Sequence, residues 1–170
     1  MAFSSVRIRA CGVIVRNEKL LLAEFYDEAA GWHFNVPVGG VEDGETVIEA
    51  VQREVREETG LIVRVGRLLM VAEFLPDRAI PVLADNPRSL SLFFECHAPE
   101  DAEPQLPELH DLLQTGVQWV ALDDLDSVPL LPRTGAQLAT LLRSEPGPER
   151  FHWEVGAQLP SQVKPQNRAR

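Results

Sequence analysis

The chain has 170 residues, of which 45% are hydrophobic and 25% charged, enough for one globular domain with a buried core. Its formal net charge of -10 repels polyanions and excludes nucleic-acid binding by backbone neutralisation. No apolar run approaches the roughly 20 residues of a membrane helix, and the N-terminus shows no charged start followed by an apolar stretch. We therefore expect a soluble, cytoplasmic protein with no membrane partner.

The first half of the chain predicts a hairpin, a strand and a helix. Apolar runs at 8–15 and 20–25 flank a polar turn and predict two antiparallel strands. Residues 32–38 predict a brief strand that ends at a pair of glycines. Residues 46–59 predict a helix, because apolar residues recur at helical spacing before a terminating glycine. These residues are Val47, Ile48, Val51, Val55 and Gly60.

The second half predicts more strands than helices. Extended segments are expected at 62–74, 90–96 and 117–122, with a short helix at 108–113. Strands mixed with separated helices predict an α+β sandwich with a mixed sheet.

Thr134 is the predicted cap of a last helix, whose apolar stripe is Leu138, Leu141 and Leu142. We assign residues 1–145 to one domain and residues 146–170 to a C-terminal extension. Phe151 and Trp153 are expected to dock that extension partly, and the polar, proline-bearing remainder is expected to be flexible.

Only two cysteines occur, Cys11 and Cys96, and each lies in an apolar run that predicts a buried strand. Two core thiols are therefore favoured over a disulfide or a metal pair.

Three glutamates share one stripe of the predicted helix, because Glu54 lies three residues before Glu57 and four before Glu58. Each like-charge pair costs roughly 0.2 to 0.5 kcal/mol, and acids in a last helical turn also face the negative end of the helix dipole. A solvated acidic face is the ordinary explanation of such a stripe. A bound Mg²⁺ would turn the repulsion into coordination, and Mg²⁺ commonly takes substrate phosphates as further ligands. We therefore expect a phosphate-bearing substrate.

Arg53 has two interpretations. It can pair with Glu49 four residues earlier as an ordinary surface contact. Alternatively, its planar guanidinium can hold Glu45 or Glu57 and so fix the preceding loop against the helix.

The spacing of these residues resembles the defining box of the Nudix hydrolase (MutT-like) family. Every specified box position is filled: Gly39, Glu45, Arg53, Glu54, Val55, Glu57, Glu58, Gly60 and Leu61. Flanking residues also match, namely Trp32, Pro37, Trp119 and Val120. The resemblance covers about residues 6–145 and implies an α/β/α sandwich with a mixed sheet and a loop-helix-loop catalytic motif.

The resemblance implies a hydrolase that cleaves the pyrophosphate linkage of a nucleoside diphosphate derivative, such as a nucleoside triphosphate or ADP-ribose. Glu54, Glu57 and Glu58 would hold Mg²⁺, with Mn²⁺ as a substitute, and a backbone carbonyl of Val38 or Gly39 would complete the protein ligands. Arg53 and Glu45 belong to the same catalytic set. Relatives use either the glutamate matching Glu54 or a loop glutamate as the base, and we favour Glu54.

Two positions outside the helix qualify the resemblance. Val38 stands where relatives commonly carry glycine, and a left-handed backbone would be costly for a β-branched residue. Some relatives take a further metal ligand from a later loop, for which Glu103 is our choice over Glu100 and Asp101. The alternative for Glu103 is a solvated acidic loop.

Substrate-binding residues are harder to assign. Trp32 and Phe34 are candidates to stack on a base, although aromatics at strand ends often belong to the core. His33 is expected at the surface. Pro76 lies fifteen residues beyond the box, a placement that resembles ADP-ribose-cleaving members of the family.

The alternative to an enzyme is a catalytically inactive Nudix-like module that binds a nucleotide as a sensor or binds a protein partner. Such modules tend to lose box acids, whereas this chain keeps them. Homodimers are common in the family, but no periodicity here indicates the oligomeric state.

Overall fold

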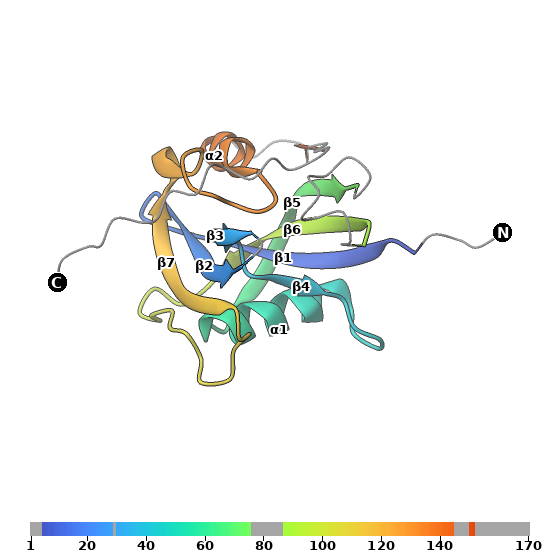
Figure 1. The fold of residues 1–170 in the computed structure, drawn as a ribbon. Coiled ribbons are helices and arrows are strands. Elements are labelled where there is room, and N and C mark those ends of the chain that lie inside the picture. The colour runs from blue at the N-terminus through green and yellow to red at the C-terminus, as the bar shows by residue number, and fades with distance from the viewer. Residues whose placement is uncertain (1–4, 29, 76–86, 145–149, 152–170) are drawn as a thin grey trace.

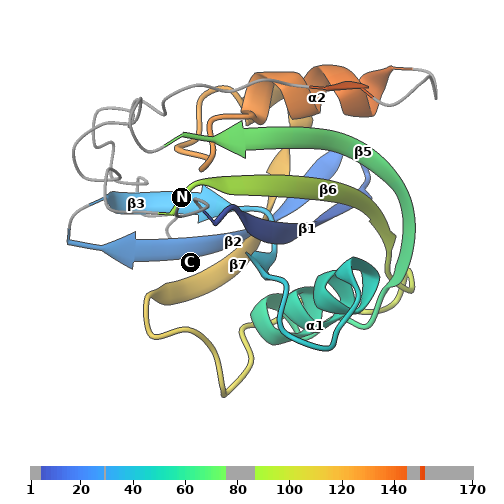
Figure 2. The same ribbon diagram turned by 90° about the vertical axis from the view of Figure 1, so that its right-hand side faces the viewer.

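A computed structural model describes residues 5–28, 30–75, 87–144 and 150–151. Two α-helices lie on opposite sides of a layer of strands (Figures 1 and 2). The strands are β1 (Arg7–Arg16), β2 (Lys19–Asp27), β3 (Gly31–Asn35), β4 (Val38–Gly40), β5 (Arg64–Phe74), β6 (Ser89–His97), β7 (Gln114–Ala121) and β8 (Arg150–Phe151). The helices are α1 (Val47–Thr59), α2 (Gly135–Arg143) and a short 3-10 helix (Leu122–Asp124).

β1 is the central strand. It runs parallel to β6 from Arg7 to Ile14 and antiparallel to β4, and it pairs with β2 only at its far end. β2 in turn lies between β3 and β7, and β5 joins the other edge of β6. The sheet is therefore mixed, and the α+β sandwich predicted from the sequence is confirmed.

The predicted hairpin is present as β1 and β2, joined by a two-residue turn. Asn17 and Glu18 both have positive φ values, 51° and 57°. Two successive residues with positive φ are the geometry of the turn whose twist matches a hairpin.

The predicted helix at 46–59 is α1, and local signals define both of its ends. The Thr46 side chain accepts from the backbone N–H of Glu49, while the Glu49 side chain accepts from the Thr46 N–H. This reciprocal capping box satisfies two backbone donors that a helix start leaves unpaired. Gly60 ends the helix with a φ of 71°, a conformation that glycine adopts without steric cost. Ile48 departs from the predicted apolar face, since it is 41% exposed.

The core has two parts, one on each side of the strands. Alternate residues of β1 point to opposite faces, so Cys11 and Val13 join the cluster beneath α2, whereas Ala10 and Ile14 join the cluster against α1. Gly12 faces α1, where an added Cβ would lie 2.4 Å from a methyl of Val55. The helix that carries the glutamates is thereby packed directly on the central strand.

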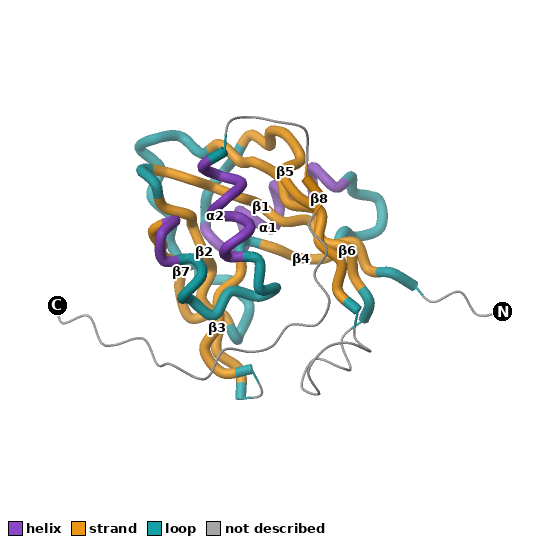
Figure 3. Tube along the Cα trace, turned by 90° about the horizontal axis from the view of Figure 1, so that it is seen from above, coloured by secondary structure: helices purple, strands orange, loops and turns teal. Residues whose placement is uncertain are grey.

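α2 lies across the strands on the other side of the molecule (Figure 3). Leu138 is fully buried, with Leu141 and Leu142 packed against the same cluster, as the predicted stripe requires. Thr134 occupies the N-cap position but its side chain makes no capping bond, because its hydroxyl donates instead to the Pro132 carbonyl.

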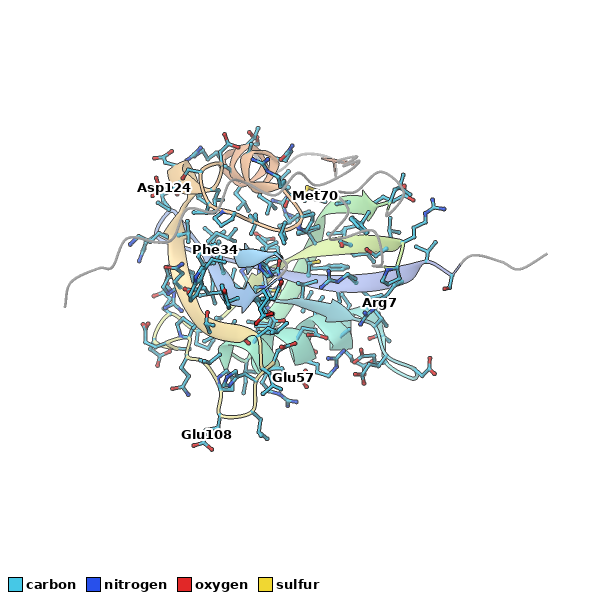
Figure 4. The ribbon with its side chains drawn as sticks, viewed as in Figure 1. Arg7, Phe34, Glu57, Met70, Glu108 and Asp124 are labelled. Carbon is cyan, nitrogen blue, oxygen red and sulfur yellow. The ribbon has the colours of Figure 1, made fainter. Side chains whose placement is uncertain are left out.

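Two segments differ from the sequence prediction. The strand expected at 32–38 is divided into β3 and β4. The helix expected at 108–113 is absent, and this segment is a loop whose tip carries Glu108 (Figure 4). Leu109 and Leu112 are 91% and 97% exposed, so these side chains have no surface to pack on and little offsets the entropy of forming a short helix.

The backbone of residues 150–151 pairs with β5 in parallel, as β8. Trp153 and the remainder of the C-terminal extension lie outside the described residues.

Candidate active site

Glu54 points from α1 into the molecule and is only 9% exposed. Its carboxylate lies directly against Gly39 of β4, where an added Cβ would stand 1.8 Å from Oε1. Any residue larger than glycine would clash with the carboxylate at this position. Glycine is therefore needed for β4 to approach Glu54 this closely. The first glycine of the box, Gly39, is thus in direct contact with Glu54 of α1.

Arg53 connects the loop before α1 to the helix. Its guanidinium donates to both carboxylate oxygens of Glu45, at 2.7 and 3.1 Å, and to the Gly40 carbonyl at 3.0 Å. It also donates to Glu54 at 2.6 Å and to Glu57 at 3.2 Å. The structure therefore favours the bracing interpretation of Arg53. The alternative partner, Glu49, is used in the capping box instead.

Burial controls the electrostatics of the glutamates. It raises the pKa of Glu58 to about 8, with the neighbouring Glu54 carboxylate adding to the effect and the Val38 N–H opposing it. Burial also raises the pKa of Glu54, although the hydrogen bond from Arg53 works in the other direction. By contrast, the pKa of Glu45 is lowered, first by Arg53 and then by the Glu42 N–H. At Glu54 and Glu58 the nearby cations, including Arg9, lower the pKa less than burial raises it, whereas the Glu45 carboxylate of the outer loop is already compensated by Arg53.

Val38 is accommodated without backbone strain. Its side chain is buried in the cluster beneath α2, and its N–H donates to Glu58 Oε2 at 3.3 Å. Among the described residues, the non-glycine residues with positive φ are Asn17 and Glu18. The left-handed geometry that would penalise valine is therefore not adopted at Val38.

The three helix glutamates line a cavity of about 750 Å³ together with β4. Within the described ranges, no three His, Cys, Asp or Glu side chains are already spaced to enclose a metal ion. Arg53 holds Glu54 and Glu57, while Glu58 is turned to the Val38 N–H. The donor set nevertheless suits a hard divalent cation, because carboxylates and backbone carbonyls are the ligands that Mg²⁺ takes. A cation would also compensate the charge of the buried Glu54 and half-buried Glu58 carboxylates.

Glu103, which the family resemblance suggests as a further metal ligand, is not part of this cluster. Its exposed carboxylate pairs with Arg16 at 3.5 Å. The Arg16 guanidinium also donates to the Pro99 and Ala102 carbonyls and lies over the Trp119 ring. Arg16 is the last residue of β1. The loop that carries Glu103 therefore lies at the opposite end of β1 from Arg7.

The predicted substrate-binding residues are dispersed. Phe34 is 4% exposed and belongs to the core, so its ring is not open to a base (Figure 4). Trp32 is half-buried, with its ring 5.2 Å from that of Tyr26. His33, expected at the surface, is buried and stacked on Phe25. Pro76 lies outside the described residues.

The cavity is also lined by charged or titratable side chains that the sequence did not indicate as site residues, among them His110, Asp111, Arg7 and Arg9. His110 and Asp111 come from the loop after β6, and Arg7 and Arg9 come from the start of β1. The two arginines alternate along a strand, which is a usable sign that they share one face. No comparable sign marks His110 or Asp111, which lie in an irregular loop.

The family model for the NUDIX domain matches residues 6–143. The chain belongs to the NUDIX family. This confirms the resemblance drawn from the box between Gly39 and Leu61, and the matched range agrees with its expected extent of about residues 6–145.

Relatives of known name match this NUDIX chain over shorter stretches. Over 67 residues it is 48% identical to an ADP-ribose pyrophosphatase of Methanocaldococcus jannaschii, which covers 39% of this chain and 39% of that protein. Over 59 residues it is 44% identical to an 8-oxo-dGDP phosphatase of Mus musculus, which covers 34% of this chain and 18% of that protein. Each match thus spans well under two thirds of the relative.

Solved structures share the NUDIX fold. An ADP-ribose pyrophosphatase from Streptococcus suis aligns with a TM-score of 0.62 at 24% identity, covering 88% of this chain and all of that one. A MutT NUDIX hydrolase from Burkholderia pseudomallei aligns with a TM-score of 0.63 at 26% identity, covering 83% of this chain and 99% of the other. Within the described residues, no helix has the length and apolar character needed to cross a membrane.

Proposed function

We propose that this chain is a Mg²⁺-dependent hydrolase that cleaves the pyrophosphate linkage of a nucleoside diphosphate derivative. The observation that carries the proposal is the buried Glu54 carboxylate, seated on Gly39 beside Glu57 and Glu58 in one cavity. Burying a carboxylate is costly unless a cation or hydrogen bonds compensate it. Arg53 compensates part of this charge, and a divalent cation would compensate the rest.

In this proposal Glu54, Glu57 and Glu58 hold the metal, together with the backbone carbonyl of Val38 or Gly39. When bound, Mg²⁺ supplies neutralisation of the diphosphate charge and a lowered pKa for the attacking water. Arg53 keeps the Glu54 and Glu57 carboxylates in place through its hydrogen bonds to both. Preorganised groups of this kind contribute to catalysis because they need no rearrangement during the reaction.

Glu54 is the proposed general base. The water oxygen forms a bond to one phosphorus, the bridging P–O bond breaks, and the water proton passes to the Glu54 carboxylate. The bridging oxygen leaves on the second phosphate, so the products are two phosphorylated fragments. Burial raises the pKa of Glu54 above that of an exposed carboxyl, which makes it a better proton acceptor near neutral pH.

The substrate class is supported by the names of the relatives. The archaeal relative is named for ADP-ribose and the mouse relative for 8-oxo-dGDP, and both compounds contain a nucleoside linked to two phosphates. We propose this shared unit as the part that the chain recognises.

The test is a substrate panel of ADP-ribose, 8-oxo-dGDP and the common nucleoside triphosphates, assayed with Mg²⁺ and with excess chelator. Glu54→Gln should lower kcat by about 100-fold or more, the usual range for loss of a group that assists proton transfer. Glu57→Gln should also lower turnover, because it removes a proposed metal ligand. Glu100→Gln, an exposed acid in the loop after β6, is the matched control and should leave kcat unchanged.

Failure of the folded wild-type protein to turn over any compound would reject the enzyme. Nucleotide binding without turnover would then support the sensor alternative.

A further inference from the structure

The carbonyl groups at the end of α1 are bonded by the part of the chain that follows β6. A helix leaves its last four carbonyls without partners inside the helix. The Thr59 carbonyl accepts from the Gln105 N–H at 2.9 Å, and the Glu58 carbonyl accepts from the side-chain amide of Gln114 at 2.7 Å. The first bond uses a backbone N–H, which any residue except proline can provide. The second bond depends on the side chain, so it is the one that the sequence specifies.

A bulge in β7 directs Gln114 toward the helix. Gln114 lies opposite Phe25 of β2, while Gly116 lies opposite Glu24. Thr115 is therefore an extra residue in β7, and its hydroxyl donates to the Glu24 carbonyl at 3.3 Å. Bulges commonly re-aim a side chain beside an active site. Here Thr115 is exposed and Gln114 is only 2% exposed, with its amide against the last turn of α1 where β7 begins (Figure 1).

The Gln114 side chain is buried with one of its two polar atoms unpaired. Its Nε2 donates to the Glu58 carbonyl and, at 3.4 Å, to the Gly116 carbonyl. Its Oε1 has no hydrogen-bond partner in the part of the chain that the structure describes. A buried acceptor without a donor is unfavourable, and methionine would fill a similar space without this cost. The amide is therefore explained by its bond to α1 rather than by packing within β7.

The same residue ends the loop that lines the glutamate cavity. The Gln114 N–H donates to the Asp111 carbonyl at 2.9 Å, and the Leu113 N–H donates to the Asp111 carboxylate at 2.8 Å. Asp111 and His110 line the cavity of about 750 Å³ together with Glu58. Gln114 thus joins this loop to the last turn of α1.

We propose that Gln114 is a positioning residue, which holds the last turn of α1 so that the Glu58 carboxylate is in place to bind the metal. This inference rests on the proposed function and deepens it, since Glu58 is one of the proposed ligands. Glu58 lies one residue before the end of α1, and helix ends fray readily. Removing a group that holds a metal ligand in place typically lowers metal affinity by about 10- to 100-fold.

The first test measures Mn²⁺ binding to the full chain without substrate, by electron paramagnetic resonance of the free ion. Gln114→Met removes the donor and should raise the Kd by about 10-fold or more, with the number of sites unchanged. Gln114→Asn should do the same, because its amide is one methylene too short to reach α1. Partial unfolding would instead lower the number of sites and leave the Kd of the folded molecules unchanged. Gln118→Met, at a half-buried glutamine of the same strand, is the matched control and should change neither quantity.

The Mg²⁺ dependence of turnover gives a second readout. In Gln114→Met the Mg²⁺ concentration for half-maximal activity should rise in parallel with the Kd for Mn²⁺. At saturating Mg²⁺, kcat should stay near the wild-type value, because all three helix glutamates are still present.

Hydrogen exchange in chelator tests the contact without a metal. The Gly60 N–H bonds the Arg56 carbonyl in the last turn of α1. It should exchange about 5-fold faster in Gln114→Met than in the wild type, the effect of losing one typical hydrogen bond. The Ala50 N–H, which bonds the Thr46 carbonyl at the start of the helix, should exchange at the same rate in both proteins.

A wild-type Kd for Mn²⁺ in both Gln114 variants would overturn the inference and leave the proposed function intact. Unchanged exchange at Gly60 in a variant that binds Mn²⁺ more weakly would also overturn it, because the effect would not then pass through the helix. Absence of Mn²⁺ binding by the folded wild-type protein would reject the proposed metal site and the role of Gln114 together. If Gln114→Met does not fold, Gln114→Asn decides the question.

Discussion

Gly39 and Glu54 are in such close contact that no side chain can be inserted between them. Gly39→Ala would place a Cβ 2.1 Å from Cδ of Glu54, so the carboxylate must move. We expect kcat to fall at least 10-fold, since misplacement of a catalytic group by about 1 Å can have effects of this size or larger. Steady-state kinetics on the best substrate of the panel measures the change.

The control for this substitution is Gly116→Ala. An added Cβ there would lie 3.9 Å from Glu24 and would meet nothing closer, so kcat should not change. Wild-type kcat in Gly39→Ala would show that the contact has no role in activity.

The raised pKa of Glu58 leads to a prediction about how the stability of the metal-free protein depends on pH. Its pKa is raised from 4.5 to about 8 in the folded state, so the folded protein binds more protons than the unfolded chain between these values. The free energy of unfolding should therefore decrease as pH rises from about 4.5 to 8. Urea unfolding in chelator at several pH values measures this dependence, and Glu58→Gln should make it flatter. An increase in stability across the same range would contradict the assignment.

At the scale of elements, Arg53 joins the glycine loop to α1. One guanidinium bonds both oxygens of Glu45 and the Gly40 carbonyl while also contacting the helix glutamates. Lysine keeps the charge but cannot reproduce the planar fork. We expect Arg53→Lys to lower kcat/KM at least 10-fold and to destabilise the fold by about 1.5 to 3 kcal/mol, the range for hydrogen bonds to charged groups.

Enzyme kinetics and urea unfolding together measure both effects. Arg56→Lys is the control, because Arg56 is exposed on the same helix and should tolerate the change. If Arg53→Lys behaved like Arg56→Lys, the bidentate contacts would not be important.

At the scale of the whole molecule, the sequence could predict those elements whose formation depends on residues close together in the chain. The hairpin and α1 are bounded by their own turn and cap residues, and the box spacing places three glutamates on one helical face. The surroundings of these elements depend on contacts distant in sequence. The parallel pairing of β1 with β6 brings Arg9 beside Ser91, and nothing local to either strand indicates that contact.

The same distinction applies to Glu103 and to residues 108–113. The charge of Glu103 and its place in a loop suggest a metal ligand, but Arg16, 87 residues away in sequence, pairs with its carboxylate away from the helix glutamates. The segment 108–113 has leucines at helical spacing, yet Leu109 and Leu112 find no surface to pack on. Arg7 and Arg9 line the cavity of the glutamates only once β1 and β4 are paired in the sheet, so their own stretch of sequence does not indicate this position.

The two buried cysteines report separately on the two halves of the core. Cys11 belongs to the cluster beneath α2 and Cys96 to the cluster against α1, and burial raises the pKa of each thiol to about 12. Since the thiolate is the reactive form, neither should react with a thiol-specific reagent near neutral pH until its side of the sheet opens. Alkylation rates of Cys11→Ser and Cys96→Ser proteins, followed by mass spectrometry, would show whether the helix that carries the glutamates opens independently of α2.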